Sequence, residues 1–187
     1  MTTRAVIGAV LAAVVIGLLP VASARSATLA GVEMPDTVVV DGTTLVLNGM
    51  GLRQAFLVKA YVGALYLEKR TSDPRVVLDS RAPKQVVLAF LRDIDRGRLS
   101  SGWADALRKS GGKAMEPSIA QFTSLIEDVN KGDTMSFTWR PGVGVEVATR
   151  GQVRGSVAGD DFARALFGLW FGPKPGDPDL KKGMLGK

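Results

Sequence analysis

The sequence contains no cysteine and no histidine among its 187 residues. Without cysteine the chain can form no disulfide and has no thiolate nucleophile. Without histidine it lacks the side chain that most often acts as a general base and as a metal ligand near neutral pH. Catalysis would have to use arginine, lysine, tyrosine, carboxylates, hydroxyls or backbone amides. The acidic residues also lack the spacing of a calcium-binding loop, so we expect neither a metal site nor a cofactor.

Aromatic residues are scarce as well, at 6% of the chain, and the positive charge is dispersed. The 24 basic and 18 acidic residues give a net charge of +6, but the lysines and arginines form no concentrated run. A nucleic-acid interface needs a basic patch, preferably with stacking aromatic side chains between the charges. We therefore expect no nucleic-acid partner and a mild attraction to anionic ligands or membrane surfaces.

Long uncharged apolar runs are absent except at the N-terminus. Residues 5–22 form such a run after the basic "MTTR", and small residues stand at Ala22 and Ala24. This layout is typical of a secretory signal peptide. We expect residues 1–24 to be cleaved and residues 25–187 to form one exported domain in a bacterial periplasm.

The alternative for this segment is a retained membrane anchor. The run is just long enough to span a bilayer as a helix. However, Gly8, Gly17 and Pro20 weaken a spanning helix, and the small residues of a cleavage site follow directly. Cleavage after Ala24 is therefore the favoured interpretation.

The rest of the sequence separates strands from helices. Asp41-Gly42 between two runs of β-branched and apolar residues predicts a hairpin. Residues 48–69 predict one long strand with a bend, and residues 72–95 predict two more strands. Further expected elements are helices at 99–110, 116–132 and 161–172 and strands at 133–141, 144–151 and 152–159, with Leu180, Met184 and Leu185 docking the tail. This order indicates a single α+β domain rather than an alternating parallel fold.

The stretch "NGMGLRQAFLVKAYVGALYLEK", residues 48–69, holds the candidate ligand site. Alternate residues of a strand share a face, so Lys59 and Tyr61 lie on one side, about 7 Å apart. Arg53 has the same parity, but a straight strand would put it roughly 26 Å from Tyr61. We expect the glycines before Arg53 to allow sharp turns and residues 53–56 to supply a bend after it.

The candidate ligand-binding residues are therefore Arg53, Tyr61 and Lys59, and we assign no catalytic residue. An arginine and a phenol that point into an apolar pocket can hold a carboxylate or an enolate. The alternative is an exposed arginine and lysine beside a tyrosine at a packing interface. The spacing alone favours this alternative.

The order of several motifs adds a resemblance to a known family. "GMGLR" followed by "FLVKAYVGALYLEK" resembles the signature of the chalcone isomerase-like family. The resemblance continues in the same order, from about Val38 onward, through "FLRDI", "DTMSFTWRPGVGVEVATRGQVRG", "DFARALFGLWFG" and "DLKKGMLG". It implies an open-faced β-sandwich, in which a large antiparallel sheet is layered with helices and a cleft lies between them.

Plant members that isomerise chalcones are one branch of this family. In them an arginine in a G-x-G-x-R segment polarises the substrate, and Arg53 matches it, while Tyr61 stands where they carry a threonine. They also use a tyrosine and an asparagine near the helix that follows the "LRD"-like strand. Residues 92–112 contain neither residue type here, which argues against cyclisation of chalcones.

The fatty-acid-binding branch matches better. Its members pair the arginine with a tyrosine in a "KVYAAGLY"-like strand to grip a carboxylate, and "KAYVGALY" puts Tyr61 at that position. Lys59 stands at a neighbouring position and could add charge, although Arg53 and Tyr61 are a few residues closer than in the family. The resemblance implies a non-catalytic binder of a fatty acid or a similar amphiphilic acid. Two alternatives stay open, namely an isomerase or intramolecular cyclase in which Arg53 stabilises an enolate, and an envelope structural module whose pocket is closed.

Overall fold

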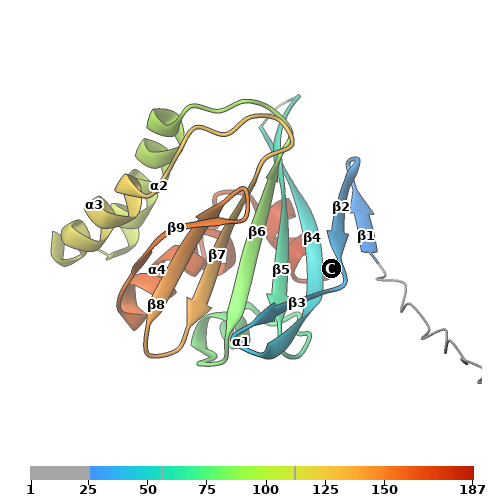
Figure 1. The fold of residues 1–187 in the computed structure, drawn as a ribbon, viewed down its shortest axis with the longest axis horizontal. Coiled ribbons are helices and arrows are strands. Elements are labelled where there is room, and N and C mark those ends of the chain that lie inside the picture. The colour runs from blue at the N-terminus through green and yellow to red at the C-terminus, as the bar shows by residue number, and fades with distance from the viewer. Residues whose placement is uncertain (1–25, 56, 112) are drawn as a thin grey trace, which may run out of the picture.

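The computed structural model describes residues 26–55, 57–111 and 113–187, so the predicted signal peptide lies outside the described residues. The strands form a two-stranded hairpin and a separate seven-stranded antiparallel sheet, whose strands follow one another in sequence order (Figure 1). The hairpin comprises β1 (Ser26–Leu29) and β2 (Val32–Pro35). The sheet comprises β3 (Thr37–Val40), β4 (Thr43–Ala55), β5 (Val58–Leu67), β6 (Lys84–Phe90), β7 (Thr134–Arg140), β8 (Gly144–Thr149) and β9 (Gln152–Val157).

The helices and the β1–β2 hairpin pack on opposite faces of this sheet. The helices are α1 (Pro74–Asp79), α2 (Arg96–Gly111), the short 3₁₀ helix η1 (Lys113–Met115), α3 (Glu116–Ser124), α4 (Asp160–Phe171) and α5 (Pro178–Met184). Their apolar side chains form one core with the sheet, while Met34 of β2 packs with Leu45 and Tyr66 in a second core. This arrangement confirms the predicted α+β class and the antiparallel sheet layered with helices. None of the described helices has both the length and the apolar character needed to cross a membrane.

The hairpin between β3 and β4 forms where the sequence predicts it. Asp41 and Gly42 have φ angles of 48° and 78°. A two-residue turn of type I′ requires positive φ at both central residues, which explains the Asp-Gly pair. Val40 and Thr43 pair directly on either side of the turn.

The prediction of one long strand over residues 48–69 is wrong. This stretch contains the end of β4 and all of β5, and the two strands run antiparallel. The alternation predicted for β5 is confirmed, because Tyr61 and Leu65 belong to the helix-side core and Ala64 and Tyr66 to the opposite core. Most residues of β5 are buried, because both faces of the strand are covered. This burial fits the largely apolar sequence of the strand.

Residues 74–79 form helix α1, so one of the two strands expected within residues 72–95 is absent there. Asp73 caps this helix by accepting a hydrogen bond from the backbone amide of Arg75 at 2.9 Å. Pro74 stands in the first turn, where its missing N–H has no helical partner to lose. The other expected strand forms as β6.

Two helix boundaries also differ from the expected ones. Helix α2 begins earlier, at Arg96, because the carboxylate of Asp95 accepts a hydrogen bond from the backbone amide of Arg98 at 2.8 Å. Helix α3 ends at Ser124, before Val129 joins an isolated β-bridge.

Helix α5 lies directly on β4 and β5. Leu180, Met184 and Leu185 are buried, as predicted for docking of the tail. The turns expected at Gly49 and Gly51 do not form, because both glycines lie within β4. They allow close contact instead, since a Cβ atom at Gly51 would lie 2.3 Å from the carbonyl oxygen of Leu180.

Candidate functional site

The β4–β5 hairpin brings together the two principal residues of the predicted site. Arg53 and Tyr61 are direct cross-strand partners, and the register shifts by a β-bulge immediately after Arg53. Directly opposed residues on antiparallel strands have Cβ atoms about 4.5–5.5 Å apart and share a face. The pair therefore meets across a hairpin, without the bend within one strand that the sequence analysis required.

Arg53 is bonded to the segment that leads into α5. Its Nη1 donates to the carbonyl oxygen of Gly176 at 2.8 Å and to Oδ2 of Asp177 at 3.0 Å. Oδ1 of Asp177 accepts hydrogen bonds from the backbone amides of Asp179 and Leu180 and so caps α5. Burial favours the neutral acid, but the hydrogen bonds from the Leu180 amide and from Arg53 outweigh it and lower the pKa of the Asp177 carboxyl. Asp177 is consequently ionised at neutral pH.

Tyr61 is buried beside Arg53, with its ring against Phe90 in an edge-to-face contact at 5.8 Å between centroids. Its Oη accepts a long hydrogen bond of 3.4 Å from Nε1 of Trp170. Burial raises the pKa of the Tyr61 phenol, which keeps it neutral at physiological pH. A neutral phenol can donate its O–H to an anion bound next to the guanidinium.

Both side chains line a cavity of about 480 Å³, a volume typical of small-molecule sites. The cavity lies among the β4–β5 hairpin, α2, α4 and the segment around Asp177. Its apolar lining consists of Leu99, Trp103, Ala106, Leu169, Trp170 and Leu180. Its charged lining consists of the basic residues Arg53, Arg98, Lys109 and Lys174 and the acidic residue Asp177. An apolar cavity with an excess of positive charge suits an amphiphilic anion.

The chemistry of this lining favours holding an anion over proton transfer. Asp177, the only carboxylate among the described residues that line the cavity, is ionised and bonded to Arg53. The neutral phenol of Tyr61 and the basic side chains are hydrogen-bond donors. Within residues 26–55, 57–111 and 113–187, no cluster of three acidic residues could hold a metal ion.

Lys59, the third predicted ligand residue, does not line this cavity. Its side chain is exposed, and its strand partner is Gln54, beyond the bulge that follows Arg53. A role for Lys59 in binding stays a prediction.

Residues from the C-terminal part of the chain also reach the site, and the sequence did not predict them. These are chiefly Asp177, Trp170 and Lys174. The Asp177-Pro178 pair is a recognisable helix-start signal, with a capping carboxylate followed by proline. Its contact with Arg53, however, spans a separation of 124 residues, and no local pattern reveals such a contact.

The matches to known proteins cover nearly all of the described residues. The family model described as chalcone isomerase-like matches residues 26–186. No curated protein matches the sequence. The solved structures that match include a fatty-acid binding protein of Arabidopsis thaliana, with 19% identity and a TM-score of 0.71 over 86% of this chain and 96% of that chain. This likeness establishes a shared fold.

Proposed function

Because this chain belongs to the chalcone isomerase-like family, we propose that it is a non-catalytic binder of a fatty acid or similar amphiphilic carboxylate in the cell envelope. The observation that carries the proposal is the cavity of about 480 Å³ with Arg53 and Tyr61 adjacent on its wall. The excess of basic residues around the cavity supports an anionic ligand. The fold shared with the fatty-acid binding protein of Arabidopsis thaliana supports a fatty acid in particular.

In this proposal the ligand carboxylate lies beside Arg53. Both hydrogen bonds from Arg53 to Gly176 and Asp177 use Nη1, which leaves the edge formed by Nε and Nη2 for a two-pronged contact with a carboxylate. Tyr61 donates its O–H to the same group. A hydrogen bond to a charged group contributes about 1.5–3 kcal/mol, and each buried methylene about 0.8 kcal/mol. The apolar wall therefore supplies most of the affinity for a fatty acid.

The envelope setting rests on the signal-peptide pattern of residues 1–24. The proposal includes contact with a membrane through the tip of the β4–β5 hairpin. Leu57 at this tip is 93% exposed, and Lys59 and Arg92 are exposed close by, since the Leu91 amide bonds to the carbonyl of Ala60. Among the described residues, neither basic side chain has an ion-pair partner. An exposed leucine near basic side chains suits an anionic lipid surface.

Native mass spectrometry of the protein purified from the periplasm of a bacterial host tests this proposal. We expect wild type to carry a fatty acid or to take up added hexadecanoic acid, and Arg53→Met to lose it. Arg75→Met is the matched control and should retain the ligand, because the Arg75 side chain is 85% exposed and outside the cavity. A wild-type protein that neither carries nor takes up a fatty acid contradicts the proposal. Recovery of the unprocessed chain in the cytoplasm contradicts the envelope setting.

A second candidate function is that of an envelope structural module, in which Arg53 serves only to fasten α5. The ion pair between Arg53 and Asp177 favours this candidate. It predicts that Arg53→Met and Asp177→Ala lower the free energy of unfolding by non-additive amounts, with the larger loss in Asp177→Ala because this change also removes the cap of α5. It also predicts that wild type takes up no fatty acid. Uptake by wild type that Arg53→Met abolishes would exclude it.

A further inference from the structure

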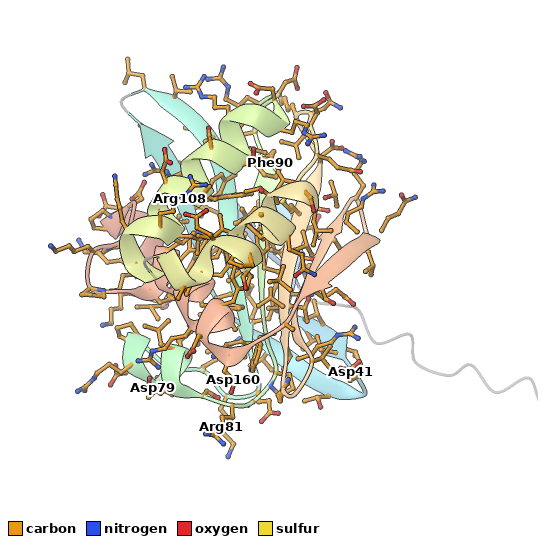
Figure 2. The ribbon with its side chains drawn as sticks, turned by 90° about the vertical axis from the view of Figure 1, so that its left-hand side faces the viewer. Asp41, Asp79, Arg81, Phe90, Arg108 and Asp160 are labelled. Atoms are coloured by element: carbon orange, nitrogen blue, oxygen red, sulfur yellow. The ribbon has the colours of Figure 1, made fainter. Side chains whose placement is uncertain are left out.

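A second and larger cavity, of about 850 Å³, opens on the helical side of the molecule. Its walls come from α1, α2, η1, α3 and α4, and its apolar lining includes Leu78, Ala114, Met115, Phe162, Ala165 and Pro173. Its charged lining consists of Asp161, Arg164 and Lys174. Two residues labelled in Figure 2 help to locate this cavity. Asp79 directly follows the lining residue Leu78, and Asp160 directly precedes the lining residue Asp161. Both lie below the layer of α2 and α3, at the end of the molecule away from Phe90. This cavity thus extends away from the end where Phe90 packs against Tyr61.

The second cavity adjoins the first one. Ser110, Gly168 and Lys174 line both of them. Gly168 lies inside helix α4, where glycine is less favourable than alanine. Close packing does not account for this glycine, because a Cβ atom there would meet no atom within 4 Å. A larger side chain at this position would instead enter the open space where the two cavities meet.

We propose that the two cavities form one extended site and that Gly168 keeps its two parts connected. This inference rests on the proposed function, with the carboxylate held at Arg53 and Tyr61. The first part of the acyl chain lies in the smaller cavity, and the far part passes Gly168 and lies along Phe162 and Ala165. The ligand class is therefore a long-chain fatty acid rather than a medium-chain one.

The affinity should rise with chain length for as long as added methylenes enter the second cavity. Burial of one methylene raises affinity by roughly fourfold. A chain that stays on the Arg53 side of Gly168 uses the first cavity alone, and only a chain that passes Gly168 gains burial in the second. A larger side chain at Gly168 should therefore weaken the binding of long-chain acids more than that of shorter ones. Loss of the carboxylate contact at Arg53 would instead weaken the binding of both.

The test compares decanoic and hexadecanoic acid in wild type and in Gly168→Leu, with binding followed by native mass spectrometry. The variant should lose at least about tenfold more affinity for hexadecanoic acid than for decanoic acid. Its melting temperature should equal or exceed that of wild type, because leucine favours a helix more than glycine does. Ser101→Leu, at an exposed position of α2 outside both cavities, is the control and should keep both affinities. Ala165→Leu, which narrows the second cavity alone, should reduce only the binding of hexadecanoic acid.

Two other results would overturn the inference while leaving the proposed function intact. One is an equal loss for both acids in Gly168→Leu, and the other is unchanged binding of hexadecanoic acid in Gly168→Leu and Ala165→Leu. Failure of wild type to bind either acid would overturn the proposed function, and this inference with it.

Discussion

Asp177 bonds Arg53 through one carboxylate oxygen and the first amides of α5 through the other. The same guanidinium is the group that we expect to bind a ligand carboxylate. Two negative charges would then lie near one arginine, and the protein's own carboxylate would weaken the attraction for the ligand. In the proposed function, the strength of binding would therefore be set partly by a residue that also holds the C-terminal helix in place.

Asp177→Asn should raise the affinity for hexadecanoic acid. The change removes a negative charge close to the bound carboxylate, which we estimate at about 1 kcal/mol, or roughly fivefold in the dissociation constant. Asparagine still caps a helix, so α5 should stay in place. Asp179→Asn is the control, because the Asp179 side chain is 89% exposed and pairs only with Lys182 on the same helix. Titration of both variants with hexadecanoic acid measures the effect. Weaker binding by Asp177→Asn would show that the Asp177 carboxylate does not weaken the attraction between Arg53 and the ligand.

The two tyrosines of the chain provide a matched pair. Tyr61→Phe removes the donor in the cavity and should weaken fatty-acid binding by roughly tenfold. It should also lower the free energy of unfolding, by at most about 1 kcal/mol, because Nε1 of Trp170 loses an acceptor at 3.4 Å. Tyr66→Phe removes the Oη that donates to the carbonyl oxygen of Pro35 at 2.9 Å on the other face of the sheet. It should lower the free energy of unfolding by about 1 kcal/mol and leave binding unchanged. Titration and urea denaturation of both variants test this, and a reversed pattern would show that Tyr61 serves packing only.

Gly51→Ala should destabilise the protein by about 3 kcal/mol or more, because the new Cβ would lie 2.3 Å from the carbonyl oxygen of Leu180. Gly102→Ala makes the same change inside helix α2, where a Cβ atom would meet nothing within 4 Å. That control should gain up to about 1 kcal/mol from helix propensity. Thermal and urea denaturation report both effects. Equal stability of the two variants would mean that the packing of α5 on β4 does not require glycine at position 51.

Stability should rise with pH through the titration of Lys84. This side chain is 3% exposed, and its Nζ donates to the carbonyl oxygens of Val77 and Ser80. Burial, with a smaller effect of Arg164, lowers the pKa of Lys84 to about 8. The unfolded chain, with an ordinary lysine pKa near 10.4, holds this proton more tightly, so unfolding becomes harder as pH rises above 8.

Between pH 8 and 10 this group should add about 2 kcal/mol to the free energy of unfolding. Above pH 10 the effect of Tyr66 opposes it, because burial raises the pKa of that phenol to about 12 and its contribution is lost from pH 10 to 12. Urea denaturation at several pH values should therefore give a steeper rise for wild type than for Lys84→Met. Parallel curves would contradict the assignment to Lys84.

Leu57→Ser should weaken binding to vesicles that contain phosphatidylglycerol. Insertion of one leucine contributes about 1.5–3 kcal/mol, so the loss in partitioning should be tenfold or more. Val153→Ser is the control, because Val153 is 60% exposed on β9, at the far edge of the sheet from the β4–β5 hairpin. Co-sedimentation at low and high salt checks both variants. Membrane contact through the hairpin tip would be refuted by an equal effect of the two substitutions.

Local sequence signals predicted the elements whose causes are local. Asp41-Gly42 supplied the two positive φ angles of its turn, and the apolar face of residues 161–172 matched helix α4. Residues 74–79 show where two local signals conflict. Val76 and Val77 have high strand propensity. The capping Asp73 and the proline after it favour a helix start, and the helix forms.

The division of residues 48–69 into two strands had no comparable signal. The turn lies between Ala55 and Val58, in a stretch without glycine, asparagine or proline, and both strands have similar apolar patterns. The sequence and its family resemblance predicted that Arg53 and Tyr61 act together. They could not predict Asp177, because its position depends on how α5 packs on the glycines of β4.

The contact of α5 with β4 and β5 also has a consequence for the order in which the protein is assembled. Synthesis proceeds from the N-terminus, so all seven strands of the sheet leave the ribosome before residues 176–185 do. Until then the glycines of β4 lack their covering helix, and Arg53 lacks Asp177. The cavity at Arg53 is therefore completed late, after the sheet that carries Arg53 and Tyr61 has been made. A ribosome stalled before residue 176 should expose a sheet that cannot yet retain a fatty acid.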